Sequence, residues 1–224
     1  MSAPRPSCLV VLSSAIEGVS AQSFVQAYTL LSPSFTLQLA SPQGRVVEFI
    51  NQDETNRRWF NEFRSKSSSM PIGLDTVDPV RYTALLVPAT GGALHDLISD
   101  KDMAQIVSHF ILEKKPVCAI GLGVAALCGA KTADKKAWVL ENYSLTAPSV
   151  YELARTPDFS SMPVILEDFV KDNGARYSCS EPDGVHVVID RHVVTGQNTQ
   201  SSLIAVQNLI LICSQKQGKV ASMR

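Results

Sequence analysis

The sequence predicts an α/β protein: a three-layer sandwich in which a mostly parallel central sheet lies between helices on both faces, as in flavodoxin-like folds. Three observations favour this class. Short, continuously apolar segments, typical of strands buried on both faces, alternate with segments of helical apolar spacing. The length of 224 residues suits one large domain. A composition of 45% hydrophobic and 18% charged residues excludes a disordered, collagenous or disulfide-framed chain.

The first half of the chain is predicted to hold three strands and two helices. Its strands are apolar runs that end at Pro, Gly or Ser, and its helices repeat apolar residues with helical spacing. Ser20 is placed to cap the first helix, and Pro33 ends it. In chain order these elements are a strand at 8–12, a helix at 21–32, strands at 36–40 and 46–50, and a helix at 54–66.

The second half continues the alternation. Pro88 ends a buried strand, a helix of small residues is expected after Gly123, and Ser149 with Glu152 has the spacing of a capping box. In chain order these elements are a strand at 82–87, a helix at 100–114, a strand at 116–120, a helix at 124–130, a short helix opening at 149, a helical turn at 167–171, strands near 177, at 186–189 and at 192–195, and a helix at 201–214.

These elements predict one domain at residues 7–214, between flexible tails at 1–6 and 215–224. The polar segment 65–73 is the best candidate for an exposed loop, but it is too short to divide the chain. The start of the sequence lacks the pattern of a signal peptide, and no apolar run reaches the roughly 18 residues of a membrane span. A cytoplasmic protein that does not insert into membranes is therefore expected.

Charge and cysteine content restrict the function classes further. A net charge of -1 with no internal basic cluster argues against strong nucleic-acid binding. The five cysteines are an odd number, most of them in apolar runs, which predicts reduced core thiols. No pair of them has metal-ligand spacing, so neither a metal nor a cofactor is predicted.

In a parallel sheet, ligands bind beyond the carboxyl ends of the strands. The loops after Leu12, Val87, Ile120 and Thr195 are therefore where chemistry is expected. Segments around these loops resemble the class I glutamine amidotransferase-like superfamily, in its PfpI and parkinsonism-associated deglycase branch. The matching segments follow the family's order; they are LVVL at 9–12, ASPQG at 40–44, YTALLVPATGG at 82–92, KPVCAIGLG at 115–123 and VTGQN at 194–198.

The resemblance implies a catalytic cysteine at the elbow between a strand and the following helix, often a histidine directly after it, and a glutamate from the loop after the first strand. Here these positions are Gly121, Leu122 and Ser20. Since glycine has no side chain to attack a carbonyl, covalent catalysis at this elbow is not possible. The sequence therefore predicts a pseudoenzyme with no catalytic residue.

Other residues near the elbow define a possible vestigial pocket. It comprises Gly121 and Leu122 together with Glu17 and the pair Gly91 and Gly92, whose amides could form an anion-binding nest. His95 is predicted to lie on a helix surface.

Two cysteines near the elbow are predicted to be inert. Cys118 lies three residues before Gly121 on a strand, an odd offset, so its side chain should point away from the elbow. Cys128 belongs to the helix after the elbow and should pack against the sheet.

Two classes of function stay open. In one, the Gly121-Leu122-Gly123 turn is a dinucleotide-binding fingerprint, with Glu141 as the acidic residue at the end of a later strand, in a small-molecule or nucleotide-binding protein or enzyme. In the other, the protein is a scaffold. Further segments, at 143–146, 149–153 and 190–198, resemble a vertebrate subgroup of the superfamily.

That narrower resemblance implies a homodimer or homotetramer that is a silent subunit of a cytosolic assembly on early endosomes. The implied assembly is the FERRY Rab-effector complex, which is linked to mRNA transport. Its other subunits are the expected partners, and its membrane association would be peripheral, through those partners.

Overall fold

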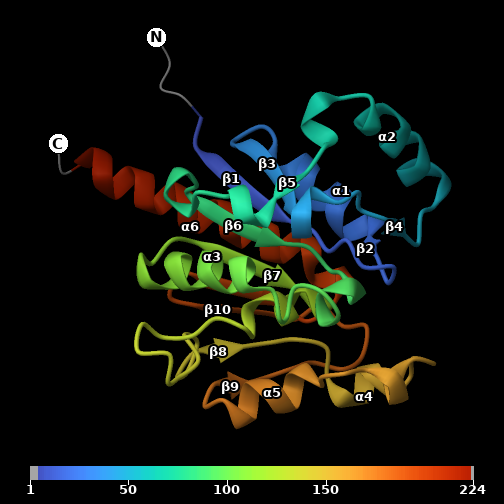
Figure 1. Ribbon diagram of the computed structural model, residues 1–224, viewed down its shortest axis with the longest axis vertical. Helices are drawn as coiled ribbons and strands as arrows, with labels where there is room; N and C mark the ends of the chain where they lie inside the picture. The colour runs from blue at the N-terminus through green and yellow to red at the C-terminus, as the bar shows by residue number, and fades with distance from the viewer. Residues whose placement is uncertain (1–4, 223–224) are drawn as a thin grey trace.

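The computed structural model describes the backbone of residues 5–222 and the side chains of residues 5–216, arranged around a seven-stranded sheet (Figure 1). Neighbouring strands pair in parallel except β10 and β11, which are antiparallel. In spatial order the strands are β10 (Val187–Asp190), β11 (Val193–Gly196), β7 (Val117–Ile120), β6 (Ala84–Val87), β1 (Ser7–Val11), β3 (Thr36–Ser41) and β5 (Ile72–Gly73). The predicted mostly parallel sheet with helices around it is confirmed.

Within residues 5–222, six α-helices surround the sheet (Figure 1). They are α1 (Ala21–Leu31), α2 (Glu54–Arg64), α3 (Lys101–Leu112), α4 (Val150–Leu153), α5 (Leu166–Asp172) and α6 (Ser202–Ser222). The predicted cap of α1 is present, since the Ser20 hydroxyl accepts a hydrogen bond from the Ser23 amide. Two short parallel pairs lie outside the main sheet: β2 (Val19–Ser20) with β4 (Phe49–Ile50), and β8 (Ser144–Leu145) with β9 (Arg176–Tyr177).

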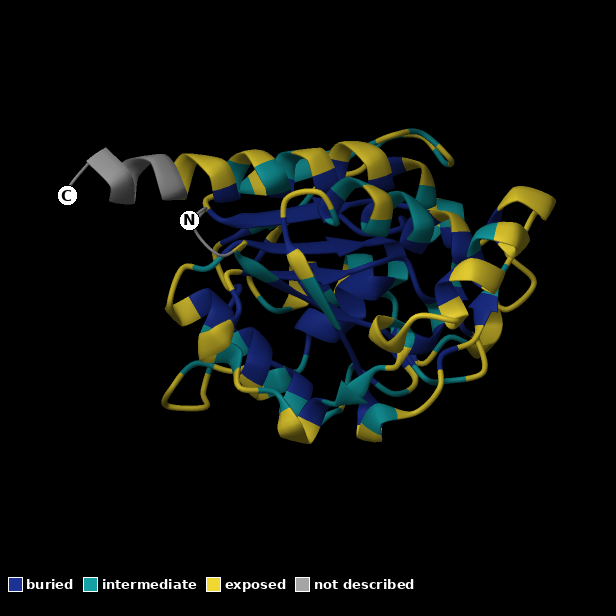
Figure 2. Cartoon of the chain, turned by 90° about the horizontal axis from the view of Figure 1, so that it is seen from above, coloured by how far each residue is buried: buried dark blue, intermediate teal, exposed yellow. Residues whose placement is uncertain are grey.

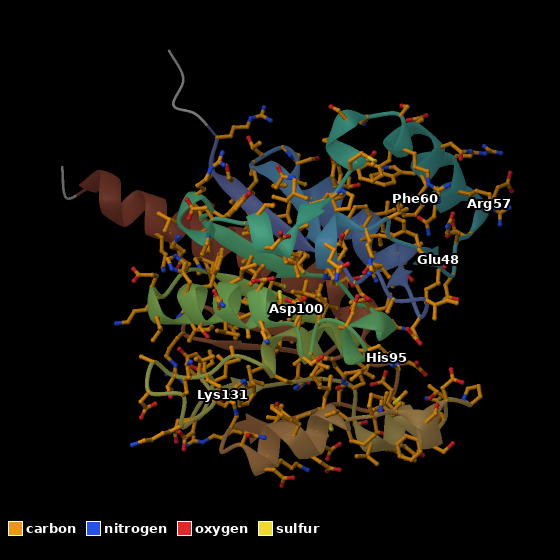
Figure 3. All side chains as sticks on the ribbon, in the orientation of Figure 1. Glu48, Arg57, Phe60, His95, Asp100 and Lys131 are labelled. Atoms are coloured by element: carbon orange, nitrogen blue, oxygen red, sulfur yellow. The ribbon has the colours of Figure 1, made fainter. Side chains whose placement is uncertain are left out.

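Alternate residues of the buried strands face two hydrophobic clusters, one on each side of the sheet. Figure 2 shows the buried strands between outer elements that carry the exposed residues. On β1, Cys8 and Val10 face the cluster built with α1, α2 and α6, whereas Leu9 and Val11 face the cluster built with α3 and α5. Phe60 on the inner side of α2 (Figure 3) stacks on Phe49 with ring centroids 4.3 Å apart. This two-sided burial explains why the strands are apolar without alternation.

Several elements differ from their predicted extent. The expected strand at 46–50 forms only β4, and β5 comes from the segment predicted to be an exposed loop. The segment after Gly121 is not an α-helix but a run of 3₁₀ turns, Gly121–Leu127. A Cβ at Gly123 would collide with the carbonyl oxygen of Pro88, so glycine at this position lets the turns pack closely against the loop after β6.

The ends of the chain also differ from the prediction. The last helix was predicted to end near residue 214, but α6 continues to Ser222, through residues predicted to be a tail. The Gln and Lys residues of that segment are good helix formers, which favours this extension. Of the predicted N-terminal tail, residues 1–4 lie outside the described residues, and the carbonyl of Pro6 already accepts a bond from the Thr36 amide. None of the helices described here is both long and apolar enough to cross a lipid bilayer.

Candidate functional site

The loops predicted to carry chemistry do meet at the carboxyl end of the sheet. The Ser20 amide donates to the Ala89 carbonyl at 2.8 Å, which joins the loop after β1 to the loop after β6. A Cβ atom built on Gly121 would lie 3.3 Å from the Ala89 Cβ and 3.7 Å from the Asn198 Cα. Gly121 therefore lies between the loops that follow β6 and β11.

Gly121 has the backbone conformation of a sharp elbow. Ile120 is extended, with φ of -128°, and Gly121 then turns into the left-handed region, with φ of +56°. An L-residue adopts that conformation only with strain, whereas glycine does so freely. The elbow geometry is present, but the position from which a nucleophile would project has no side chain.

The other two positions matched to reactive groups have structural roles. Leu122 is half-buried and packs against the cluster on the α3 side of the sheet. Ser20 caps α1 and is bonded to Ala89 through its backbone. Neither side chain can act as a general base at neutral pH.

The predicted vestigial pocket is only partly assembled. Glu17 lies beside Gly91, and its carboxylate Oε1 is 3.6 Å from Nε2 of His95. Both side chains are about two-fifths exposed, at 39% and 43%. His95 follows the 3₁₀ turn Gly91–Leu94 at the margin of the molecule (Figure 3), exposed as predicted but not on an α-helix.

A carboxylate that the sequence analysis missed holds the loop after β1. Oδ2 of Asp96 accepts hydrogen bonds from the Ser13 hydroxyl at 2.9 Å, from the Ser14 amide at 2.8 Å and from the Ala15 amide at 3.1 Å. Ser13 in turn packs against Gly92, where a Cβ would collide with it. The partners are 83 residues apart in sequence, so local spacing carries no signal of this contact.

A second polar network fills the space beside the elbow. Oε2 of Glu152 accepts from the Gln197 amide group at 2.8 Å, and its Oε1 accepts from the Asn198 amide group at 2.9 Å. Gln197 is fully buried and Asn198 is 7% exposed. The capping box is thus only half formed: the Ser149 hydroxyl accepts from the Glu152 amide, but the Glu152 carboxylate is used by the loop after β11.

The cysteines near the elbow are core thiols, as predicted. Cys118 is fully buried on the α1 and α6 side of the sheet, and burial raises its pKa well above the ordinary value. Burial also raises the pKa of Cys128 to about 12. Cys179 is the exception to the general prediction, because it is exposed.

Two hollows of the described surface lie away from the elbow. The larger is an open groove of about 560 Å³ beside α4, with Tyr151, Cys179 and Glu181 in its walls. A smaller hollow of about 290 Å³ lies next to Trp138. Neither is lined by Gly121, Glu17 or the Gly91 and Gly92 pair.

The alternative based on a dinucleotide fingerprint lacks its structural context. Gly121 opens 3₁₀ turns and not the α-helix whose N-terminus would hold a pyrophosphate. Glu141 was expected at the end of a strand, but it lies in a turn against Gly174. In the part of the chain that the structure describes, no three His, Cys, Asp or Glu side chains are grouped to hold a metal ion.

No protein-family model matches the chain. Two curated relatives are named glutamine amidotransferase-like class 1 domain-containing protein 1. The one from Xenopus laevis is 55% identical over 210 residues, which are 94% of this chain and 91% of the relative. The one from Homo sapiens is 53% identical over 212 residues, covering 95% and 96%.

Solved structures share the fold at low sequence identity. The Francisella tularensis rapid encystment protein has a TM-score of 0.84 at 20% identity, over 93% of this chain and 99% of its own. Glyoxalase III from Candida albicans has a TM-score of 0.82 at 18% identity, over 92% and 97%. Drosophila melanogaster DJ-1beta has a TM-score of 0.61 at 14% identity, over 98% and 97%.

The sheet, the left-handed elbow after β7 and these neighbours define an α/β protein with the fold of DJ-1. Within that class, the chain belongs to the family of glutamine amidotransferase-like class 1 domain-containing protein 1.

Proposed function

We propose that the chain is a catalytically silent member of its family that works as a homo-oligomeric scaffold, a partner-binding subunit of a cytosolic assembly on early endosomes. The proposed assembly is the FERRY Rab-effector complex, which is linked to mRNA transport. The observation that carries the silent part is Gly121, because the elbow keeps its left-handed turn and has no side chain there.

The remaining thiols supply no substitute nucleophile at the elbow. The reactive form of cysteine is the thiolate, and burial disfavours that charged form at Cys118 and Cys128. Leu122 and Ser20 add no base. Because the elbow has no reactive group, the function of the protein must depend on its surface. This favours a role in binding other proteins.

Turnover assays test the silent part. We expect the purified protein to show no amidase, esterase, glyoxalase or deglycase activity above buffer. Glu17→Ala and Cys179→Ser are the matched controls, since Glu17 lies beside Gly91 and Cys179 is an exposed thiol, so that either could supply a hidden reactive group. Turnover that either substitution removes would overturn the proposal, whereas turnover unchanged by both indicates a contaminant.

Restoring the reactive groups tests whether the elbow is still competent. In a Cys179→Ser background, Gly121→Cys with Leu122→His and Ser20→Glu should give a thiol that iodoacetamide alkylates at least about tenfold faster at pH 7 than the thiol of Gly121→Cys alone, because the added histidine favours the thiolate and lowers the pKa of the thiol. A Cβ at this position would lie 3.3 Å from the Ala89 Cβ at a φ of +56°, so all variants carrying Gly121→Cys share a tight contact and a strained backbone, which the comparison of rates cancels. Equal rates would mean that the loss of function extends beyond these three residues.

Affinity purification at physiological salt tests the scaffold role. We expect stoichiometric recovery of other subunits of the endosomal assembly. Sub-micromolar binding of the isolated protein to single-stranded RNA at that salt is not expected, because a net charge of -1 leaves few cations to neutralise phosphates. Strong RNA binding without a stoichiometric protein partner would contradict the proposal.

A further inference from the structure

Two long segments of the chain contain no charged residue. Residues 18–44 and 193–215 have no Asp, Glu, Lys or Arg, although charged residues make up 18% of the sequence. These segments contain α1 and the first two-thirds of α6. At the chain's average composition, several charges would be expected in each segment.

The two helices lie side by side on one face of the sheet and form one surface. They pack against each other, and the Ser202 hydroxyl donates to the Ser23 hydroxyl at 2.8 Å. Figure 2 shows α6 along this face with exposed residues on its outer side. We call this surface the α1–α6 face.

The α1–α6 face exposes aliphatic and amide side chains. On α6, Leu203 is 42% exposed and Leu211 is 57% exposed, and Gln207 is exposed between them. On α1, Gln22 is exposed and Val25 is half-buried. A helix that faces water normally carries charges on its outer side, so this composition is typical of a surface that is covered in the working protein.

We infer that the α1–α6 face is the surface through which two copies of this chain associate about a twofold axis. The inference rests on the proposed self-association and names the surface that performs it. A twofold axis brings each side chain near its own copy or that of a neighbour, so like charges would repel there. Over residues 21–31 and 202–215 the face has no charged residue, and amides such as Gln207 both donate and accept hydrogen bonds, which lets them pair with themselves.

The size of the face also suits a second copy. At 1.5 Å per residue, α1 is about 16 Å long and the uncharged part of α6 about 21 Å, and two helices about 10 Å wide present roughly 400 Å² in projection. The accessible area is larger than this projected area, because side chains protrude from the helices. The neighbouring edge strand β10, where Ile189 is 49% exposed, adds further apolar area. A standard interface buries about 800 Å² of accessible surface per partner, so the face can form its central part.

A charge-insertion experiment tests the inference. Leu203→Lys with Leu211→Lys should weaken self-association at least about 100-fold, because four cations would meet in the interface of two copies. Light scattering should then give a mass near 24.3 kDa at concentrations where the wild type has a multiple of it. The matched control is Leu112→Lys on α3, which replaces a leucine of the same 57% exposure and should leave the mass unchanged.

The outcomes separate the inference from the proposed function. A monomeric wild type removes self-association from the proposed function and overturns the inference with it, while leaving the silent role and the partner role standing. An oligomeric wild type whose mass is unaffected by the double variant overturns the inference alone.

Cross-linking keeps the test decisive if the double variant does not fold. In a Cys179→Ser background, Gln207→Cys should give disulfide-linked dimers under mild oxidation, and Gln105→Cys on the outer side of α3 should not. The reverse pattern, or linkage through neither position, contradicts the α1–α6 face as the contact.

Discussion

The layer of α1 and α6 and the layer of α3 and α5 cover opposite faces of the same sheet, and they differ in what they present to solvent. Both bury an apolar cluster against alternate residues of the strands. The outer side of α3 begins with Lys101 and Asp102 and is followed by Glu113, whereas α1 and residues 202–215 of α6 carry no charge. Packing against the sheet requires apolar residues only on the inner side of each helix. The residues on the outer side are not constrained by the core, so their composition can reflect what binds there.

The elbow adds to this comparison. Its backbone geometry is maintained by Gly121, while the three positions matched to reactive groups are filled by a glycine, a packing leucine and a capping serine. Structural requirements are therefore met on both layers and at the elbow. The elbow differs from an active site in having no reactive side chain, and the layer of α1 and α6 differs from the layer of α3 and α5 in having no charge over residues 21–31 and 202–215.

The largest expected effect checks that the two cores are equivalent. Phe24→Ala beneath α1 and Phe110→Ala beneath α3 should each lower the free energy of unfolding by about 3–5 kcal/mol, because both rings are almost completely buried. Urea unfolding of both variants, at a concentration where wild-type oligomer content is known, measures this. A loss below about 1 kcal/mol for either ring would show that one layer contributes little to folding.

An intermediate effect concerns the neutral histidine that precedes the uncharged segment. His192 is 5% exposed, and burial, with Lys216 and Arg191 nearby, lowers its pKa to about 4. Between pH 6.5 and 4 the unfolded chain therefore binds a proton at His192 that the folded chain does not bind. The free energy of unfolding is highest above pH 6.5, and this histidine lowers it by about 2–3 kcal/mol as the pH falls toward 4.

The control for this pH effect is His192→Gln, which removes the titrating group from both states. Urea unfolding of the two proteins between pH 7 and 4.5 should show a steeper loss of stability for the wild type. Parallel curves would mean that His192 has the same pKa in the folded and unfolded states and that the acid sensitivity comes from carboxylates.

The smallest effect distinguishes the helix caps of the two layers. Ser20 caps α1 with a hydroxyl and Asp100 caps α3 with a carboxylate, each accepting a bond from the amide three residues on. Ser20→Ala and Asp100→Ala should each cost about 1 kcal/mol. The cost at Asp100 should shrink in 1 M salt, since salt screens a charge at a helix N-terminus, while the cost at Ser20 should not. Identical salt responses would contradict an electrostatic difference between the layers.

Local patterns in the sequence predicted the parts of this protein that depend on local physics. Apolar runs and Pro or Gly boundaries predicted the main strands, and Ser20 was correctly placed as a cap. Ordered motifs identified the family, and the offset of Cys118 from Gly121 predicted which way that thiol points. These predictions succeed because strand alternation, capping and turn chemistry are decided within a few residues of each other.

Only the tertiary structure decided which distant groups meet. The contact of Asp96 with Ser13 spans 83 residues, and the bond of Ser202 to Ser23 spans 179. Neither pairing has a sequence signal, because it depends on the strand order that brings β1, β6, β7 and β11 together and on the side of the sheet to which each crossover sends its helix. The absence of charge in 18–44 and 193–215 is readable in the sequence, but these residues become one surface only because α1 and α6 are placed on the same face.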